Sequence, residues 1–314
     1  MSDPVAAIEI DHLSCTFRRS ESLHDICLTI PTGSVFGLVG LNGAGKTTLI
    51  RHLIGGLRPQ AGRVRVLGED PTLTPESVMQ RIGYVAEEDA LPRWMTVGQL
   101  LAFMRAMYRN WDENLCRELL ETFSLDPTKK LADLSKGGRA RAGLLVAIAH
   151  RPDLLILDEP SYGLDPIARQ DILEAVVRTA SDEGRTVLFS SHLLDEVSRV
   201  CDTVGVICGG HLLETIAMQD LTERYSEVVC ELASAMSAPP TMSGFFGWQG
   251  RGREWSVAVD RSVHDHDARV QHSLGPHSLI EIRPISLERW FAARVAANRT
   301  TVVTASSQVE VVSR

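Results

Sequence analysis

The chain has 314 residues, of which 44% are hydrophobic and 23% charged, and its formal net charge at pH 7 is −8. This composition is typical of a globular protein with one large domain and a smaller one, and its acidic balance excludes a general nucleic-acid-binding protein. The scattered cysteines form no CxxC pair, which excludes a disulfide scaffold or zinc cluster and fits a reducing cytoplasm.

The N-terminal segment, MSDPVAAIEIDH, has neither a basic start nor an apolar stretch, so we expect no signal peptide. No apolar run approaches the roughly 20 residues of a membrane-spanning helix. We therefore expect a protein that does not cross a membrane itself.

Three almost wholly apolar runs end abruptly in polar residues. They are SVFGLVG (Ser34–Gly40), DLLILDEP (Asp153–Pro160) and RTVLFSSH (Arg185–His192). Such runs suit parallel strands covered on both faces, and helical patterns such as Ala168–Gly184 lie between them. The pattern predicts an α/β fold whose ligand binds at the carboxyl ends of the strands.

The first run leads into GLNGAGKT at Gly40–Thr47, a G-x-x-x-x-G-K-[ST] pattern that opens the predicted helix KTTLIRHLIGG. A strand before the pattern and a helix after it favour a phosphate-binding P-loop over a mere glycine-rich turn. Backbone N–H groups would cradle the phosphates, Lys46 would reach the β- and γ-phosphates, and the Thr47 hydroxyl would ligate Mg²⁺. The predicted cradle comprises Asn42, Gly43, Ala44, Gly45, Lys46, Thr47 and Thr48.

The other two runs end in candidate catalytic groups. Asp158 can hold Mg²⁺, and Glu159 can polarise an attacking water as a general base. His192 can reach the γ-phosphate from the end of the third run. Solvated acids and a capping histidine are the plain alternatives, and the P-loop in the same chain favours the catalytic roles.

After about Leu221 the pattern changes to a small α+β unit. Its predicted strands are SEVVCELAS (226–234), REWSVAVD (253–260) and SLIEIRPIS (278–286), and its predicted helices cover 262–274 and 287–299. We assign residues 222–296 to this accessory domain. Residues 297–314 lack bulky anchors and are predicted to form a disordered tail.

Four strings follow the P-loop in order: LSKGG (Leu134–Gly138), LLILDEP, GLD (Gly163–Asp165) and SSH. In this order they resemble the ATP-binding subunit of an ABC (ATP-binding cassette) transporter, over about Ile8–Leu221. The resemblance implies a P-loop NTPase domain at residues 1–221, with a mostly parallel core sheet, an antiparallel β subdomain and a helical subdomain at about 88–150.

The resemblance also implies roles for individual residues. Phe17 would stack on adenine, although packing in the core is the alternative for this side chain. Glu159 would be the catalytic glutamate and His192 the switch histidine. The remaining implied nucleotide contacts are Ser135, Gly137 and Gly138 of the signature and Asp165 of the D-loop.

Two positions depart from the family pattern. In IGYVAEED (Ile82–Asp89), Glu87 stands where the family has the Q-loop glutamine. Mg²⁺ accepts a carboxylate oxygen, so Glu87 remains a candidate ligand, and its charge should raise the pKa of nearby carboxyl groups. In the signature, Lys136 replaces a glycine and Gly138 replaces the glutamine. Lys136 points either to an anion or to solvent.

The resemblance implies ATP and Mg²⁺ as cofactors and a mechanism in which two such domains close head to tail around two ATPs. A second ABC ATPase chain and separate transmembrane permease subunits would be the partners, with peripheral attachment at the cytoplasmic face of the membrane. The LSKGG form, Glu87 and the ending SLERWF (Ser286–Phe291) are similar to exporter-type members. A non-transport ABC ATPase with a regulatory or assembly role is the alternative, and a simple P-loop kinase or GTPase would not need the signature.

Overall fold

The computed structural model describes residues 6–17, 20–88, 90–236, 242–263 and 279–298. The chain divides into two compact units, Met1–Leu212 and Leu213–Arg314. The domain boundary predicted from the sequence follows residue 221, somewhat further along the chain. From residue 299 on, the predicted tail lies outside the described residues.

The main sheet has six strands in the order β5-β6-β7-β3-β8-β9. The strands are β3 (Val35–Val39), β5 (Ile82–Val85), β6 (Leu154–Asp158), β7 (Thr186–Ser191), β8 (Thr203–Cys208) and β9 (His211–Ala217). From β5 to β8 all neighbours are parallel. Every residue of β3, β6 and β7 is buried, as expected for strands covered on both faces. The predicted α/β fold with a parallel core is confirmed.

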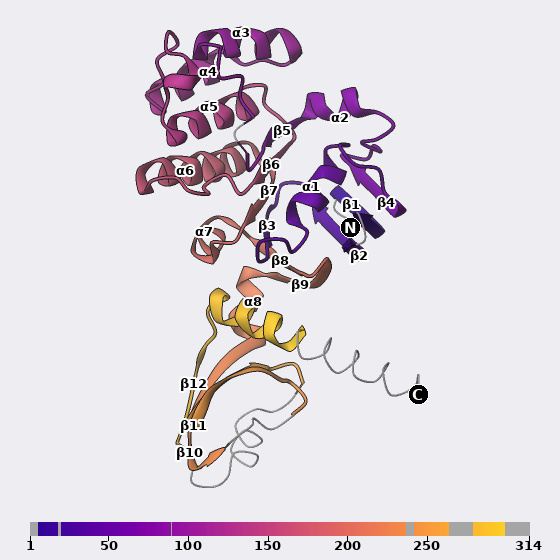
Figure 1. The fold of residues 1–314 in the computed structure, drawn as a ribbon, viewed down its shortest axis with the longest axis vertical. Helices are drawn as coiled ribbons and strands as arrows, with labels where there is room; N and C mark the ends of the chain where they lie inside the picture. The colour runs from indigo at the N-terminus through magenta and orange to yellow at the C-terminus, as the bar shows by residue number, and fades with distance from the viewer. Residues whose placement is uncertain (1–5, 18–19, 89, 237–241, 264–278, 299–314) are drawn as a thin grey trace. The chain divides into compact units, whose positions relative to one another are not determined.

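Helices cover both faces of this sheet: α5 and α6 lie on one side and α1 on the other (Figure 1). The helices of the first unit are α1 (Lys46–Leu53), α2 (Pro75–Arg81), α3 (Val97–Met107), α4 (Glu113–Thr122), α5 (Lys136–Ala149), α6 (Pro166–Glu183) and α7 (Leu194–Val200). A short 3₁₀ turn, Leu131–Asp133, precedes α5. The helices α3, α4 and α5 group together at the edge of the sheet formed by β5 (Figure 1).

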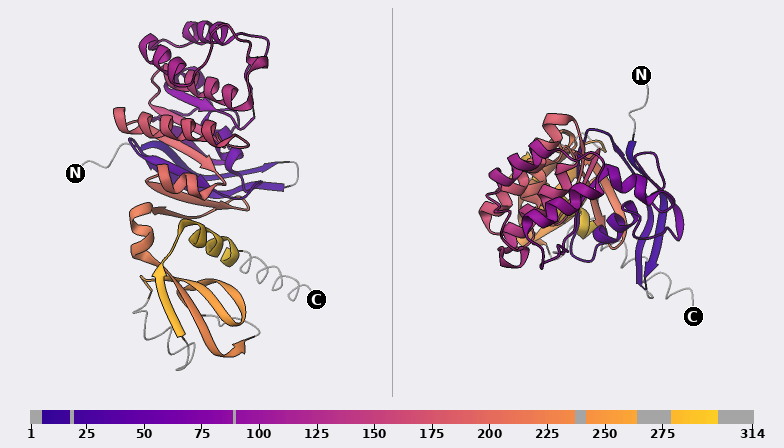
Figure 2. Two further views of the ribbon diagram at one scale, coloured as in Figure 1. Left: turned by 90° about the vertical axis from the view of Figure 1, so that its left-hand side faces the viewer. Right: turned by 90° about the horizontal axis from the view of Figure 1, so that it is seen from above.

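A second, antiparallel sheet of order β2-β1-β4 lies beside α1. Its strands are β1 (Ala6–Phe17), β2 (Ser20–Pro31) and β4 (Ala61–Val66), and the β1–β2 hairpin projects away from the main sheet (Figure 2). The α1 side chains Leu49, Ile50 and Leu53 are buried in one core with residues of both sheets, such as Ile26 and Leu38. This packing fixes the start of α1 at the carboxyl end of β3.

The second unit contains α8 (Met218–Arg224) and an antiparallel sheet in which β10 (Tyr225–Met236) lies between β11 (Phe245–Asp260) and β12 (Leu279–Pro284). Residues 287–298 form a helix whose Trp290 is fully buried. The three strands match the predicted ones, although β11 begins earlier. Most of the helix predicted at 262–274 lies outside the described residues. Among the described helices, none has the length and apolar character needed to cross a lipid bilayer.

Candidate active site

The P-loop joins the end of β3 to the start of α1. Gly43 and Gly45 have φ angles of +77° and +112°, which side-chain-bearing residues rarely adopt. A Cβ at Gly45 would lie 2.9 Å from the Ser22 carbonyl oxygen, whereas nothing lies within 4 Å of a Cβ at Gly43. No side chain caps the first N–H groups of α1. The loop is therefore open on one side and presents free backbone donors, which fits a phosphate group.

Lys46, the first residue of α1, points back into this loop. Its side chain is buried, and Nζ donates a hydrogen bond to the Gly40 carbonyl oxygen at 2.7 Å. Nζ also lies 2.9 Å from Oε1 of Glu159. The lysine and the glutamate thus meet, which joins two motifs that are far apart in the sequence.

Asp158, the last residue of β6, is fully buried beside the P-loop. Burial raises the pKa of its carboxyl group and the Glu159 charge raises it further, while hydrogen bonds from Ser190 and Thr47 oppose the shift. Ser190 Oγ donates to Oδ1 at 2.7 Å, and among the described residues Oδ2 has no hydrogen-bond partner. An unpartnered carboxylate oxygen beside the Thr47 hydroxyl fits a hard, oxygen-binding cation such as Mg²⁺.

Glu159 links Lys46 to His192. The Nδ1 atom of His192 lies 2.6 Å from Oε2 of Glu159. Because an ionised carboxylate only accepts hydrogen bonds, the ring carries its hydrogen on Nδ1 and leaves Nε2 for another partner. Glu159 also has a φ of +49°, a strained backbone held by hydrogen bonds from its N–H to both oxygens of Ser190. Strain of this kind concentrates at functional sites.

The signature residues form a second group at the start of α5. Ser135 is the N-cap, and its Oγ accepts a hydrogen bond from the Gly138 N–H at 3.0 Å. A Cβ at Gly137 would lie 2.7 Å from Ala168 Cβ and 3.2 Å from Asp165 Oδ2. Asp165 caps α6, because its carboxylate accepts hydrogen bonds from the N–H groups of Ile167 and Ala168. These bonds, chiefly that from Ala168, lower the pKa of the Asp165 carboxyl group. The signature and the D-loop therefore pack directly on each other.

The structure answers the question that the sequence left open for Lys136. Its Nζ donates a hydrogen bond to the Tyr162 carbonyl oxygen at 2.6 Å and lies 5.0 Å from the centre of the Tyr162 ring. The amine thus points neither to free solvent nor into the P-loop of its own chain.

The nucleotide and metal roles of all the predicted site residues remain predictions, and for three of them the structure shows other surroundings or none. Glu87 follows β5 and is exposed, and its charge raises the pKa of Tyr84, for which burial is the larger cause. Phe17 pairs with Ser20 at the end of the β1–β2 hairpin, and its side chain lies outside the described part of the chain. Asp165 is engaged in helix capping. The nucleotide roles of Asn42, Ala44 and Thr48 likewise rest on their place in the P-loop and the first turn of α1.

The motif analysis missed Ser190, which holds both carboxylate residues of the site. The string FSSH offered a signal for it. Two hydroxyl groups at the polar end of a buried strand can form hydrogen bonds to the carboxylates at the end of the adjacent parallel strand. It also missed a buried network in which Glu196 accepts hydrogen bonds from Ser161 and Ser191 and pairs with Arg169.

Comparison with known proteins agrees with this geometry. The family model described as "ABC transporter" matches residues 23–162. The ABC transporter ATP-binding protein YtrB of Bacillus subtilis is 27% identical over 292 residues, which cover 93% of this chain and 99% of the relative. The bacitracin transport ATP-binding protein BcrA of Bacillus licheniformis is 33% identical over 219 residues, which cover 69% and 72%.

A solved structure of an ATP-binding subunit of an ABC transporter superposes with a TM-score of 0.63 at 28% identity, covering 69% of this chain and 92% of that one. The P-loop and the buried Asp158 lie within the residues that the family model matches, and Lys46 and Glu159 of that segment meet His192. The chain belongs to the ABC transporter ATP-binding proteins, as a subunit that binds and hydrolyses ATP to power transport.

Proposed function

We propose that this subunit drives export through separate transmembrane permease subunits, using ATP with Mg²⁺ held by Thr47, Asp158 and Glu87. The observation that carries the nucleotide part is the cluster of Lys46, Glu159 and His192 next to an open P-loop. Mg²⁺ supplies charge neutralisation of the phosphates when bound. The LSKGG signature and the C-terminal unit, which resemble those of exporter-type members, support the direction.

The ion pair between Lys46 and Glu159 gives the site a defined first event. Phosphates of an incoming nucleotide attract the lysine amine, so Nζ leaves Oε1. Glu159 then keeps its hydrogen bond from His192 and gains a free oxygen that can accept a proton from water. Nucleotide binding thus frees the general base.

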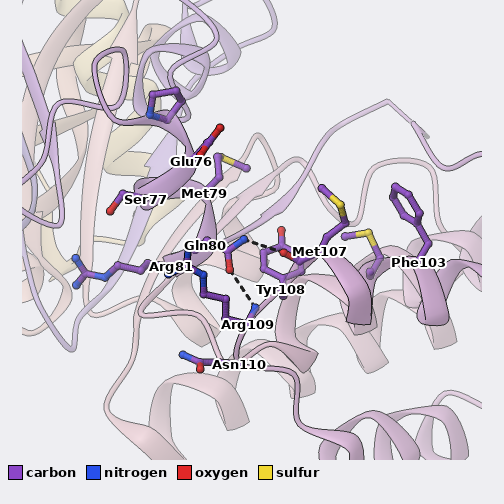
Figure 3. Close-up of a pocket in the computed structure, with 12 residues that line it drawn as sticks. Glu76, Ser77, Met79, Gln80, Arg81, Phe103, Met107, Tyr108, Arg109 and Asn110 are labelled. Carbon is purple, nitrogen blue, oxygen red and sulfur yellow. Dashed lines mark hydrogen bonds between the residues drawn. The ribbon is translucent and has the colours of Figure 1, made fainter.

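A groove of about 940 Å³ between α2 and α3 supports docking on a membrane partner (Figure 3). Phe103 and Met107 line it and are 51% and 58% exposed. Gln80 of α2 donates to the Met107 carbonyl oxygen at 2.9 Å and accepts from the Arg109 N–H at 3.1 Å, which ties the two walls together. An apolar helix of the permease, exposed at the cytoplasmic face, suits this groove. Attachment of the subunit to the membrane would then be peripheral.

Fractionation of native membranes tests the docking. The wild-type chain should sediment with the membranes, and the double variant Phe103→Ser, Met107→Ser should move to the soluble fraction with unchanged basal ATPase activity. Leu73→Ser is the matched control, because Leu73 is an apolar side chain that is 74% exposed and lies outside the residues lining this groove. Equal sedimentation of the double variant would contradict docking at this groove.

Inverted membrane vesicles test the direction of transport. For an exporter, ATP added outside such vesicles should cause a compound to accumulate inside them. The accumulation should disappear with Lys46→Ala, which removes the cation at the phosphates and should abolish binding of a fluorescent ATP analogue. Loss of a preloaded compound from the vesicles on addition of ATP would indicate import instead.

A further inference from the structure

Tyr162 lies between the two groups of site residues, and no motif assigns it a role. It lies three residues after Glu159 and directly before the D-loop, and it is 48% exposed. Its ring meets the His192 ring edge-on, with the ring centres 5.6 Å apart and the planes inclined by 65°. A large aromatic side chain with so much exposed surface adds little to the core, so its contacts need another explanation.

On one side, Tyr162 restricts the histidine that contacts the general base. The hydrogen bond from Nδ1 of His192 to Glu159 fixes one ring atom but leaves the plane of the ring free to turn. An edge-on aromatic contact at a second point of the ring restricts that plane. Tyr162 thereby fixes where Nε2 of His192 points.

On the other side, Tyr162 is held by the signature. The Lys136 amine donates to the Tyr162 carbonyl oxygen at 2.6 Å and lies over its ring. A Cβ at Gly163 would lie 2.5 Å from this amine, so a larger residue at that position would force the lysine side chain to move. Lys136 is the first residue of α5, and the next residue, Gly137, packs on Ala168. The start of α5 is therefore attached to the backbone at Tyr162.

We propose that Tyr162 is a positioning residue for the His192–Glu159 pair and that Lys136 holds it there. A shift at the start of the signature helix is then transmitted through Tyr162 to the general base of the same chain. The inference rests on the proposed function as an ATPase subunit and on the head-to-tail dimer that the family resemblance implies, in which the start of α5 would face the nucleotide of the partner chain. Each chain would thus couple the partner's nucleotide to its own hydrolysis.

Steady-state ATPase kinetics of the full chain test the positioning role. Tyr162→Leu should lower kcat about 5- to 50-fold and leave KM for ATP within about twofold, because the histidine ring turns while the phosphate cradle stays intact. Tyr162→Phe keeps both the ring and the carbonyl group and should retain kcat. Wild-type kcat for Tyr162→Leu, equal damage by both substitutions, or a rise in KM that matches the fall in kcat would overturn the proposal.

The lysine has its own pair of variants. Lys136→Met should lower kcat in the same way as Tyr162→Leu, and Lys136→Arg, which still donates to the carbonyl oxygen, should retain it. Lys129→Met, the loss of another exposed lysine, is the control for a general charge effect and should leave kcat unchanged. Thermal unfolding of each variant checks folding. Unchanged kcat for Lys136→Met would overturn the role of the lysine.

Heterodimers separate this role from direct contact between Lys136 and the partner's nucleotide. One chain carries Glu159→Gln, so that only the other chain hydrolyses ATP, and two affinity tags select the mixed dimer. Lys136→Met should lower the rate when it is in the hydrolysing chain and not when it is in the Glu159→Gln chain. An effect in the Glu159→Gln chain alone, or an equal effect in both, would overturn the proposal. A chain that never dimerises would refute the head-to-tail dimer implied by the family resemblance, and the kinetic comparison alone would then decide the positioning role.

Discussion

Glu159 has a different partner on each carboxylate oxygen, Lys46 on Oε1 and His192 on Oε2. Glutamine keeps the shape of the side chain, but its single carbonyl oxygen can accept a hydrogen bond from only one of the two partners, and it cannot accept a proton from water. Glu159→Gln should therefore lower kcat by about 10²- to 10⁴-fold with little change in ATP binding. On gel filtration, ATP should convert this variant to a dimer because bound nucleotide is no longer consumed. Full turnover would show that Glu159 is not the general base.

The place of the candidate site residues in the fold could be predicted from the sequence, because these residues lie in short local strings. Lys46 and Asp158 each stand at the end of a buried strand or the start of a helix, where their neighbours in sequence fix their place. Ser190 could not be predicted in the same way, since its bonds to Asp158 and Glu159 cross between two strands. The direction of Lys136 was equally inaccessible, because its partner at Tyr162 is 26 positions away.

At the scale of elements, two of the three glycines of α5 lie in very different surroundings. A Cβ at Gly137 would lie 2.7 Å from Ala168 of α6, whereas a Cβ at Gly143 would have Leu91 Cδ1, at 4.0 Å, as its nearest neighbour. Gly137→Ala should thus lower the free energy of unfolding by about 1 to 3 kcal/mol. Gly143→Ala should raise it by about 0.5 to 1 kcal/mol, because alanine is the better helix former. Urea unfolding measures both, and equal effects would contradict the close packing of α5 on α6.

Glu196, a buried residue of α7, contacts Ser161, Ser191 and Arg169. Its burial makes the free energy of unfolding depend on pH. Burial raises the pKa of its carboxyl group above 4.5, while hydrogen bonds from Ser161 and the Arg169 charge oppose the shift. The folded chain therefore binds the proton of the Glu196 carboxyl group more tightly than the unfolded chain does. The stability that this protonation contributes is lost as pH rises through the pKa of Glu196 in the folded chain.

Comparison with Glu196→Gln isolates this contribution, because the other titrating groups cancel. Between about pH 4 and pH 8, the free energy of unfolding of wild type relative to Glu196→Gln should fall as pH rises, by at most about 1.4 kcal/mol per unit. Urea titrations at several pH values measure the difference. A difference that stays constant, or that grows with pH, would contradict the raised pKa.

The predictability of the fold also differs between elements. β3, β6 and β7 were recognisable because continuous apolar runs of that length suit only buried strands or buried helices, and the polar residues that follow favour strands. The sheet β2-β1-β4 has register shifts between β1 and β2 that interrupt a simple alternation of apolar and polar residues. Its presence was therefore implied by the family resemblance rather than by the pattern. β11 begins before its predicted start because a glycine-rich segment, Gly247–Gly252, reads as a loop although it lies within the strand.

At the scale of the molecule, the P-loop group and the signature group of one chain are complementary halves. The P-loop group has free N–H donors and a lysine, whereas the signature group presents a helix start whose Ser135 is exposed. The Lys136 amine of that helix start is bonded to Tyr162, so it does not reach the P-loop of its own chain. On the head-to-tail arrangement that the family resemblance implies, a complete site would combine the P-loop group of one chain with the signature group of a second chain.

Mixing two inactive variants tests this sharing directly. Lys46→Ala removes the phosphate contact, and Ser135→Arg blocks the start of α5, so either variant alone should be inactive. In a one-to-one mixture, half of the dimers combine the two and contain one intact site out of two, so about a quarter of the wild-type rate should return. A chain that carries both changes, mixed with either single variant, contains no intact site and should restore nothing. If the mixture of single variants also stays inactive while gel filtration shows mixed dimers, the two chains do not share sites head to tail.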